Sequence, residues 1–227
     1  MNAPQPLTID IWSDVMCPWC LVGWGNLTQA LEQLEGEIEA EVRWHAFELN
    51  PDMAAAGEER TAHIARKYGR TIDQSRDVQD RMREAAQSAG VSLDYDGAEP
   101  APPAMMWNTF AAHKLLTWAG EAHGSERQTA LKLALFAAHF HHRRPIGERE
   151  ELLAIAVEQG FDRKGAEAAL DSAELAQQVR AEERAAWDMN ITGVPAMIVA
   201  GKFLIPGAQS SKVYVDTLKR VAQKLAD

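Results

Sequence analysis

The sequence predicts an α/β protein in which an all-helical domain is inserted into a strand-containing domain. Three observations support this class. The first 47 residues follow the pattern strand, helix, strand, most segments from about residue 58 to 190 have helical spacing, and short strands return beyond Gly193. We therefore predict a discontinuous domain from residues 1–52 and 190–227, connected through a helix at 173–189, with 53–172 as the inserted helical domain.

The N-terminal elements are predicted from two different periodicities. Leu7, Ile9 and Ile11 alternate with Thr8, Asp10 and Trp12, as in a half-buried strand. Apolar side chains then recur at helical spacing at Trp24, Leu27, Leu31 and Leu34. Gly36 ends that helix, and alternation resumes at Val42, Trp44 and Ala46. Such a βαβ unit favours a parallel pair of strands.

The middle of the chain is predicted to be helical with one long loop. Asn50-Pro51 breaks the chain, and a helical stretch follows that is interrupted near Gly69 and closed by Gly90. Residues 94–103 are rich in Gly, Pro and Asp, which is typical of a loop. Further helices are predicted at 104–123, 125–142, 147–159, 162–170 and 173–189.

The C-terminal region returns to strands and ends in a helix. Residues 196–199 and 202–205 are predicted to be two short strands joined by a hairpin turn at Ala200-Gly201. An amphipathic helix follows, capped by Ser210 or Ser211 and carrying apolar side chains at Tyr214, Leu218, Val221 and Leu225.

The two cysteines of the chain lie three residues apart, at the junction of the first strand and the first helix. Pro18 falls at the first helical position, where the absent N–H costs nothing. Cys17 then lies at the N-cap, where unpaired amides and the helix dipole stabilise a thiolate. Cys20 lies one turn into the helix and can close a disulfide with Cys17. This geometry predicts Cys17 as the attacking thiolate and Cys20 as the resolving thiol.

Metal sites are weaker explanations of the same pair. A structural zinc site would require two histidines from elsewhere, and an iron–sulfur cluster held by cysteines needs about four of them. His139, His141 and His142 form the densest histidine group, but only His139 and His142 share a helical face. We therefore expect no native metal.

Composition excludes several partners. The formal net charge of −10 argues against nucleic acid and anionic membranes, since both reward clustered Lys and Arg. We find no signal-peptide pattern and no apolar window of membrane-spanning length, so the cytoplasm is the expected location. There, reducing systems tend to keep a cysteine pair reduced at rest.

Several short motifs resemble one known family over nearly the whole chain. They are Ser13-Asp14 before Cys-Pro-Trp-Cys, Phe47-Glu48-Leu49-Asn50-Pro51, Asn108-Thr109 with Ala112-His113, Gly193-Val194-Pro195 and Gly207-Ala208-Gln209. Together they resemble the FrnE-like branch of the DsbA family. The resemblance implies a thioredoxin fold with a helical insertion, a thiol–disulfide oxidoreductase with redox residues Cys17 and Cys20, and a cis Pro195 facing them. It implies no required cofactor beyond the redox-active disulfide, and it allows glutathione as a co-substrate.

The residues around the motif are candidates for substrate binding and proton transfer. Trp19 is predicted to be exposed between the sulfurs, and Val194 to offer backbone groups to an extended peptide or glutathione beside Pro195. Asp14 and Glu48 are candidate proton relays, although such a residue at a strand end is more often a solvated turn residue. His113, on an apolar helical stretch, is expected to be a core histidine.

The sequence departs from many relatives at two places that bear on substrate choice. Where they carry an acidic, glycine-bearing stretch, this chain has His139-Phe140-His141-His142-Arg143-Arg144, which predicts a more basic rim of the cleft. Ala196-Met197 replaces the aromatics that often follow the Val-Pro, which predicts a wider or softer groove.

We therefore expect a DsbA-like enzyme acting on protein or small-molecule disulfides, in an oligomeric state that the sequence leaves open. One alternative is a glutathione-dependent transferase or 2-hydroxychromene-2-carboxylate isomerase on the same fold, which would need only one activating group at the helix N-terminus. The other, from a different class, is a peptide-binding or chaperone module that uses the groove beside Pro195.

Overall fold

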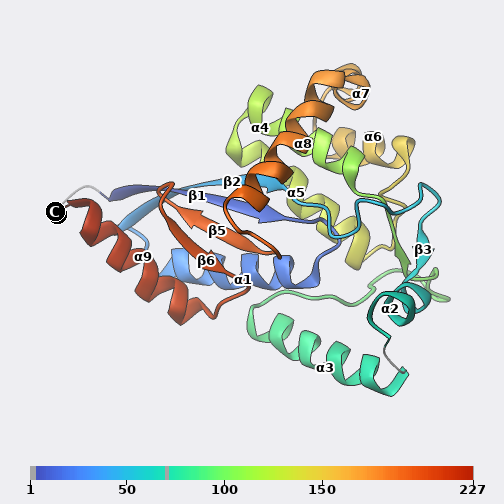
Figure 1. Ribbon diagram of the computed structural model, residues 1–227, viewed down its shortest axis with the longest axis horizontal. Coiled ribbons are helices and arrows are strands. Elements are labelled where there is room, and N and C mark those ends of the chain that lie inside the picture. Colours follow the sequence, from blue (N-terminus) through green and yellow to red (C-terminus); the bar gives the residue numbers. More distant parts are fainter. Residues whose placement is uncertain (1–3, 70–71, 227) are drawn as a thin grey trace.

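Strands from both ends of the chain form a single four-stranded sheet in the computed structural model, which describes residues 4–69 and 72–226 (Figure 1). The strand order is β2-β1-β5-β6, with bounds Ile38–Ala46, Gln5–Ser13, Ala196–Val199 and Phe203–Pro206. The predicted parallel pairing of β1 with β2 is confirmed, with Ile9 opposite Val42. β5 runs antiparallel to β1, with Ile11 opposite Met197.

The β5–β6 hairpin has the turn that its sequence predicts. Ala200 and Gly201 have φ angles of 52° and 65°, so both central residues are left-handed, as a type I′ turn requires. Val199 pairs with Phe203, so Lys202 also lies in the loop and β6 begins one residue later than predicted. The hairpin starts immediately after Pro195, so its register fixes where the Val194-Pro195 segment lies against β1.

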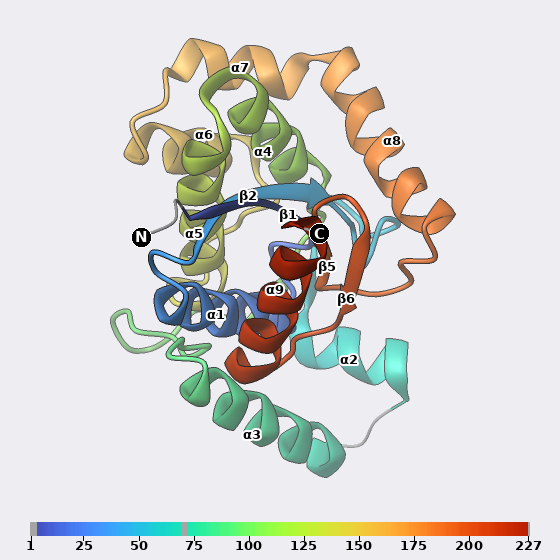
Figure 2. The ribbon, with the colours of Figure 1, turned by 90° about the vertical axis from the view of Figure 1, so that its left-hand side faces the viewer.

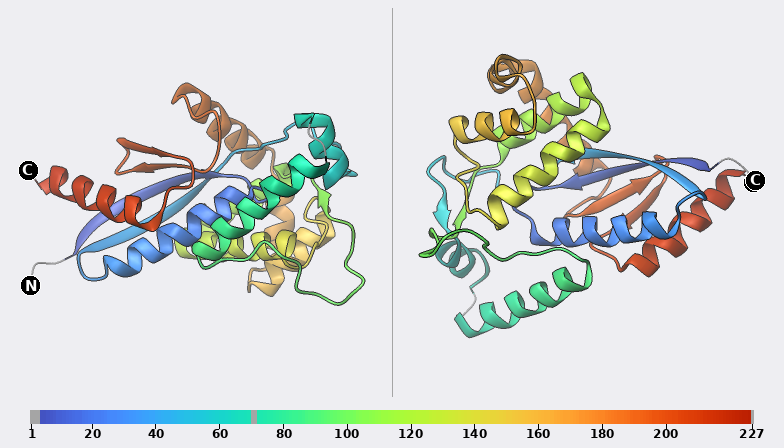
Figure 3. Two further views of the ribbon diagram at one scale, coloured as in Figure 1. Left: turned by 90° about the horizontal axis from the view of Figure 1, so that it is seen from below. Right: turned by 180° about the vertical axis from the view of Figure 1, so that it is seen from behind.

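Two helices cover one face of the sheet. α1 (Pro18–Gln33) and α9 (Ser211–Ala226) lie side by side below it in Figure 2, and Figure 3 shows the same pair from two further sides. Their apolar stripes pack on the inward side chains of β1 in a core that includes Ile9, Ile11, Leu27, Tyr214 and Leu218, all about 1% exposed or less. This core fixes the direction of α1 and therefore the place of its first turn.

A group of helices packs against the opposite face and the β2 edge (Figure 2). Its members are α4 (Phe110–His123), α5 (Ser125–Phe140), α6 (Arg149–Glu158), α7 (Arg163–Asp171) and α8 (Ala173–Asp188). Their shared core also takes in Val15 and Met16 from the segment after β1, so apolar packing crosses the domain boundary that we predicted. Within the described part of the chain, no helix combines the length and apolarity needed to span a membrane.

The segment between β2 and α4 differs from the all-helical expectation. α2 (Arg60–Tyr68) and α3 (Ile72–Ser88) are flanked by a two-stranded sheet of β3 (Glu58–Glu59) and β4 (Met105–Met106). The helix predicted from residue 104 is wrong at its start, because α4 begins only at Phe110. The Asn108 side chain accepts the Phe110 N–H at 3.0 Å and donates to the Met53 carbonyl at 3.1 Å, which favours a turn over a helix there.

A half-buried charged cluster joins the sheet to α8. His45 of β2 contacts Asp10 of β1 through Nε2 at 2.9 Å and Glu182 of α8 through Nδ1 at 3.3 Å. Its ring stacks on Trp12 with centroids 4.5 Å apart. Burial alone would lower the pKa of His45, but the two carboxylates raise it to about 9. The folded protein therefore favours the protonated imidazolium form of His45.

We predict that this cluster makes stability fall at alkaline pH. A folded pKa of about 9, above the ordinary value of about 6.5, means that the full stabilisation is present below pH 6.5 and is lost as the pH rises through 9. The expected loss is about 2 kcal/mol of unfolding free energy. Urea unfolding of wild type and His45→Gln at pH 6.5 and 9.5 measures it, since the difference between the two proteins should shrink by that amount. A difference that is constant with pH would contradict the assignment.

Candidate active site

The cysteine motif lies at the first turn of α1. Cys17 is the N-cap residue in an extended conformation, and Pro18 occupies the start of the helix, as the spacing predicts. The Cys17 N–H donates to the Asp14 carbonyl and the Cys20 N–H to the Cys17 carbonyl, each at 3.1 Å. Both cysteines are free thiols and buried, whereas Trp19 between them is 40% exposed. The tight turn holds the two sulfurs together beside an accessible indole.

The segment before β5 faces the motif. The Val194-Pro195 peptide bond is cis, and the Cys17 Sγ lies 3.7 Å from the Val194 carbonyl oxygen. Pro195 packs on α1 at Gly23, where an added Cβ would lie only 3.0 Å from the proline Cγ. Gly23 thus allows the close approach of Pro195 to the helix, a role that the sequence analysis did not assign.

Asp14 lies beneath the motif with no solvent exposure. Its Oδ2 accepts the Leu49 N–H at 2.7 Å and its Oδ1 the Met16 N–H at 3.3 Å. Burial would raise the pKa of Asp14, but buried His113, whose Nε2 lies 3.8 Å from Oδ1, outweighs it together with the Leu49 N–H and Lys132, and the pKa is lowered. The carboxylate is therefore anionic and holds the loop that precedes Cys17.

Lys132 of α5 is a fully buried ammonium that the sequence analysis missed. Its Nζ lies 3.4 Å from the Ser13 carbonyl and within 5.2 Å and 5.0 Å of the Trp44 and Phe136 ring centroids. Burial lowers its pKa to about 8, although the negative charges of Cys20 and Asp14 oppose the shift. The sequence feature that could have identified Lys132 is its position on the buried face of α5, which includes Gln128, Leu131, Lys132, Leu135 and Phe136.

The charges around the sulfurs differ from those that the helix N-terminus alone predicts. The hydrogen bond to Cys20, together with burial, raises the pKa of Cys17. Burial also acts to raise the pKa of Cys20, but the Cys17 thiol and Lys132 overcome it and lower that pKa. The two thiols share a hydrogen bond and therefore titrate as a pair, and the nearby Lys132 charge favours the singly ionised form of that pair. Access still distinguishes the two, because Cys17 lines a cavity that Cys20 does not.

Glu48, the second candidate relay, contacts α8. Its side chain is fully buried and binds Arg180, which also contacts Glu183 at 2.7 Å. Burial and the nearby Glu183 charge raise the pKa of Glu48 to about 7. The structure thus places Asp14 beside the motif and engages the Glu48 carboxylate in a separate cluster, and a relay role for either remains a prediction.

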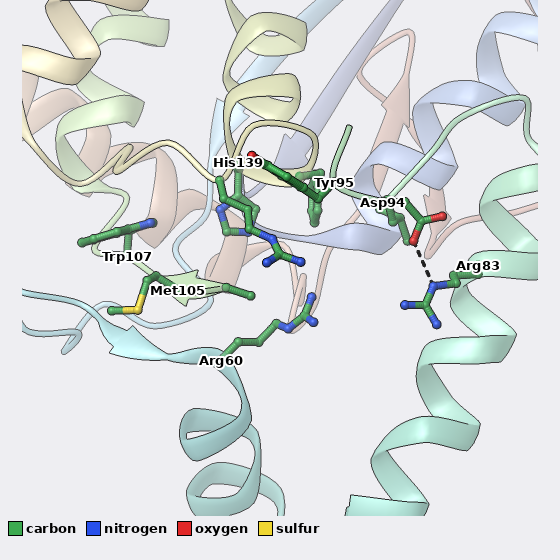
Figure 4. Close-up of a pocket in the computed structure, with 11 residues that line it drawn as sticks. Arg60, Arg83, Asp94, Tyr95, Met105, Trp107 and His139 are labelled. Carbon is green, nitrogen blue, oxygen red and sulfur yellow. Dashed lines mark hydrogen bonds and ion pairs between the residues drawn. The ribbon is translucent and has the colours of Figure 1, made fainter. Parts of the chain in front are cut away.

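A cavity of about 370 Å³ opens beside Cys17, between the motif and helices α2 and α3. Pro18, Trp19 and Val194 line it together with Cys17, so four of the predicted site residues share one cavity with side chains from α2 and α3. It adjoins a smaller pocket in which Arg60, Arg83 and His139 lie (Figure 4). The cavity beside Cys17 is therefore walled on one side by the inserted helices.

The three histidines considered as metal ligands have separate partners. His139 is half-buried and lines the cavity, while His141 contacts the Ser92 carbonyl at 2.9 Å and His142 contacts Asp96 at 3.0 Å. Across residues 4–69 and 72–226, no group of three or more His, Cys, Asp or Glu side chains is arranged to hold a metal ion.

Comparisons with known proteins agree with this arrangement. A family model described as a DSBA-like thioredoxin domain matches residues 8–219. The chain is similar to the crystal structure of a probable DsbA oxidoreductase, SCO1869, from Streptomyces coelicolor, with 30% identity, a TM-score of 0.84, and 96% of this chain and 90% of that chain covered.

Two further comparisons cover most of the chain. The uncharacterized protein YwbO of Bacillus subtilis (strain 168) is 27% identical over 210 residues, or 91% of this chain and 92% of that protein. A 2-hydroxychromene-2-carboxylate isomerase structure shares the fold at 18% identity and a TM-score of 0.64, with 97% of this chain and 98% of that chain covered.

Proposed function

Because the chain belongs to the family of DsbA-like thioredoxin domains, we propose that it is a thiol–disulfide oxidoreductase that cycles Cys17 and Cys20 between dithiol and disulfide. Its substrates are protein or small-molecule disulfides, and glutathione can serve as co-substrate. We further propose that it belongs to the FrnE-like branch, which its motif residues resemble, and that its compartment is the cytoplasm, where thiol-reducing systems would regenerate the dithiol. The observation that carries the proposal is the pair of interacting thiols in one helical turn, with Cys17 lining the cavity.

In the first step Cys17 attacks a substrate disulfide. Cys20, whose pKa is lowered by the Cys17 thiol and Lys132 against the effect of burial, takes up the Cys17 proton as the Cys17 sulfur bonds to one substrate sulfur. The substrate S–S bond breaks, and the other sulfur leaves as a thiolate. The product is a mixed disulfide between Cys17 and the substrate.

In the second step Cys20 resolves the mixed disulfide. Its thiol loses its proton to the solution, and the buried ammonium of Lys132 stabilises the thiolate that forms. Cys20 attacks the Cys17 sulfur, the bond to the substrate breaks, and the second substrate sulfur leaves as a thiolate. The substrate gains two electrons, the pair becomes the Cys17–Cys20 disulfide, and oxidation of a dithiol substrate reverses these steps.

The cavity positions the substrate for these steps. The Val194 carbonyl lies 3.7 Å from the Cys17 sulfur, and it is a backbone acceptor at the point where a substrate must approach. Trp19 adds an exposed apolar surface on the motif side. An extended disulfide-containing chain or a small disulfide can therefore lie between Trp19 and Val194 with its sulfur at Cys17.

The glutathione-dependent isomerase remains the second candidate because the isomerase structure shares the fold. The second cysteine distinguishes the two functions. Isomerisation needs one activating group at the helix N-terminus, whereas disulfide exchange uses a resolving thiol as well. The presence of Cys20 and its contact with Cys17 favour exchange.

We predict that the protein catalyses dithiothreitol-driven reduction of a protein disulfide and shows little isomerase turnover of a hydroxychromene carboxylate in glutathione. Wild type, Cys20→Ser and the double Cys→Ser variant are to be assayed for both reactions. Exchange should fall sharply without Cys20 for any substrate whose release depends on resolution. Isomerase turnover that survives loss of Cys20, with disulfide reduction no faster than in the double variant, would replace the proposal with the second candidate.

A further inference from the structure

The cavity beside Cys17 combines an apolar wall with a cationic end. Its volume of about 370 Å³ lies in the range of small-molecule sites. Much of the wall consists of apolar side chains, among them Ile64, Val78, Met82, Leu93 and Met106. Arg60 and Arg83 line both this cavity and the adjoining pocket, which Arg143 also lines. A ligand that suits both parts has an apolar body and a negatively charged group.

Arg60 differs from the other two arginines at this end because its guanidinium has no hydrogen-bond or ion-pair partner among the described residues. Its backbone N–H donates to the Ala104 carbonyl at 2.8 Å, which fixes the start of α2 against the residues before β4. Its guanidinium makes no hydrogen bond or ion pair with any residue that the structure describes, although the residue is half-buried. Burial lowers the pKa of Arg60, and the positive charges of Arg143 and Arg83 act in the same direction. An anion at this point would remove an electrostatic cost of the folded state.

The charged residues next to Arg60 already have hydrogen-bond or ion-pair partners. Arg83 pairs with Asp94 at 3.0 Å and Asp80 at 3.2 Å, and Figure 4 shows the Asp94 contact. Arg143 donates to the Pro102 carbonyl and lies 5.0 Å from the Tyr95 ring centroid. The nearest carboxylate in the sequence, Glu59, caps α2 by accepting the Thr61 and Ala62 N–H groups. No carboxylate of the described chain forms an ion pair with Arg60, and the Glu59 charge offsets only part of the effect of burial and of the two arginines, since the pKa of Arg60 stays lowered.

His139 adds a neutral polar group at the same place. It lines both pockets, and Figure 4 places it opposite Arg60 across the pocket. Burial lowers the pKa of His139 to about 4, and the Arg60 charge acts in the same direction. The imidazole is therefore uncharged near neutral pH and can share a hydrogen bond with an anionic ligand without adding charge.

We propose that Arg60 is the anion-binding residue of the substrate site and that the enzyme prefers low-molecular-weight disulfides that carry a carboxylate on an apolar body. The proposal rests on the exchange activity proposed above. The guanidinium binds the carboxylate, the apolar wall holds the body, and the disulfide meets Cys17 at the other end of the cavity. Cys17 and Cys20 supply the two electrons, and both substrate sulfurs leave as thiolates, as in the steps given above.

The test compares two disulfides that differ only in charge. Reduced protein is mixed with dithiobis(nitrobenzoate), whose aromatic arms each carry a carboxylate, or with its uncharged bis(methylamide), and the released nitrothiolate is followed by absorbance. The variants are Arg60→Gln and, as a matched control, Arg43→Gln, which removes an exposed arginine paired with Glu41 on β2. Wild type should react faster with the dicarboxylate than with the bis(methylamide). Arg60→Gln should lower the ratio of the two rates by about tenfold, as expected for one charge-assisted contact, whereas Arg43→Gln should keep the wild-type ratio.

A binding measurement separates this inference from the exchange activity. The unreactive S-methyl thioether of the same nitrobenzoate is titrated calorimetrically into the double variant Cys17→Ser, Cys20→Ser. The dissociation constant should rise about tenfold when Arg60→Gln is added, and that of the corresponding methylamide should stay within about twofold.

The outcomes distinguish the two proposals. If neither disulfide reacts with wild type above the rate of a small free thiol, while the thioether binds in an Arg60-dependent way, the exchange proposal fails and the anion site stands. If both disulfides react but the rate ratio and the thioether affinity are the same with and without Arg60, the anion site is refuted and exchange stands. An Arg60→Gln protein that slows both disulfides equally would also refute it, because a charge-specific role predicts a change in the ratio.

Discussion

Replacing Cys17 with serine is expected to lower dithiol–disulfide exchange by at least about a thousandfold, because a serine hydroxyl stays protonated near neutral pH and cannot form a disulfide. Cys20 cannot take over, since it is about 1% exposed and does not line the cavity. Replacing Cys20 with serine should instead leave the first attack possible and trap the mixed disulfide on Cys17. Intact-mass measurement after incubation with a disulfide substrate detects the adduct.

The two single variants serve as controls for each other. Both remove one thiol from the same helical turn, so a general effect on folding should appear in both, and thermal unfolding measures it. Brief alkylation of the reduced wild type should label Cys17 first because of its access to the cavity. Equal trapping by Cys17→Ser, or first labelling of Cys20, would reverse the assigned roles.

Replacing Lys132 with methionine is expected to slow exchange at pH 7 by about ten- to a hundredfold and to move the pH–rate profile one to two units toward alkaline pH. The ammonium lowers the pKa of Cys20 and is itself buried, so no solvent screens its effect. Activity should recover at alkaline pH, where the thiols ionise without its help. A loss that is the same at every pH would contradict an electrostatic role.

Lys114→Met is the matched control for Lys132→Met. Lys114 is a second buried lysine of the helical group, but its Nζ donates to the Leu170 carbonyl at the end of α7. This substitution should alter stability and leave the pH–rate profile unchanged. Methionine approximates the volume of the lysine stem and removes a buried charge, so Lys132→Met is expected to fold, and thermal unfolding of both variants checks this.

Local sequence patterns were enough to predict the strands and the helix around the cysteine motif. Alternation predicted β1 and β2, and the spacing of apolar residues predicted α1, with Cys17 at its N-cap and Pro18 at its start. The Ala200-Gly201 turn was predictable because few residues tolerate two consecutive left-handed conformations. These features depend on backbone sterics and hydrogen bonding within a few residues, which a short window of sequence contains.

Parts of the inserted region were not predictable in the same way. The strands β3 and β4 have two residues each and lie far apart in the sequence, so neither shows an alternating pattern. The late start of α4 depends on the Asn108 side chain reaching the Met53 carbonyl, a contact between distant segments. Each of these features exists only because separate parts of the chain meet.

The sequence by itself determined where the two sulfurs that we propose for the redox chemistry lie, at the start of α1, because their spacing and helix position are local properties. Only the tertiary structure decided which charges surround the two thiols and which side chains line the cavity beside them. Lys132 lies beneath Cys20, and Arg60 lies in the cavity without a carboxylate partner, because α5 and α2 pack there. The energy of a charge depends on its burial and on its neighbours in space, and both are set by contacts between residues that are distant in the chain.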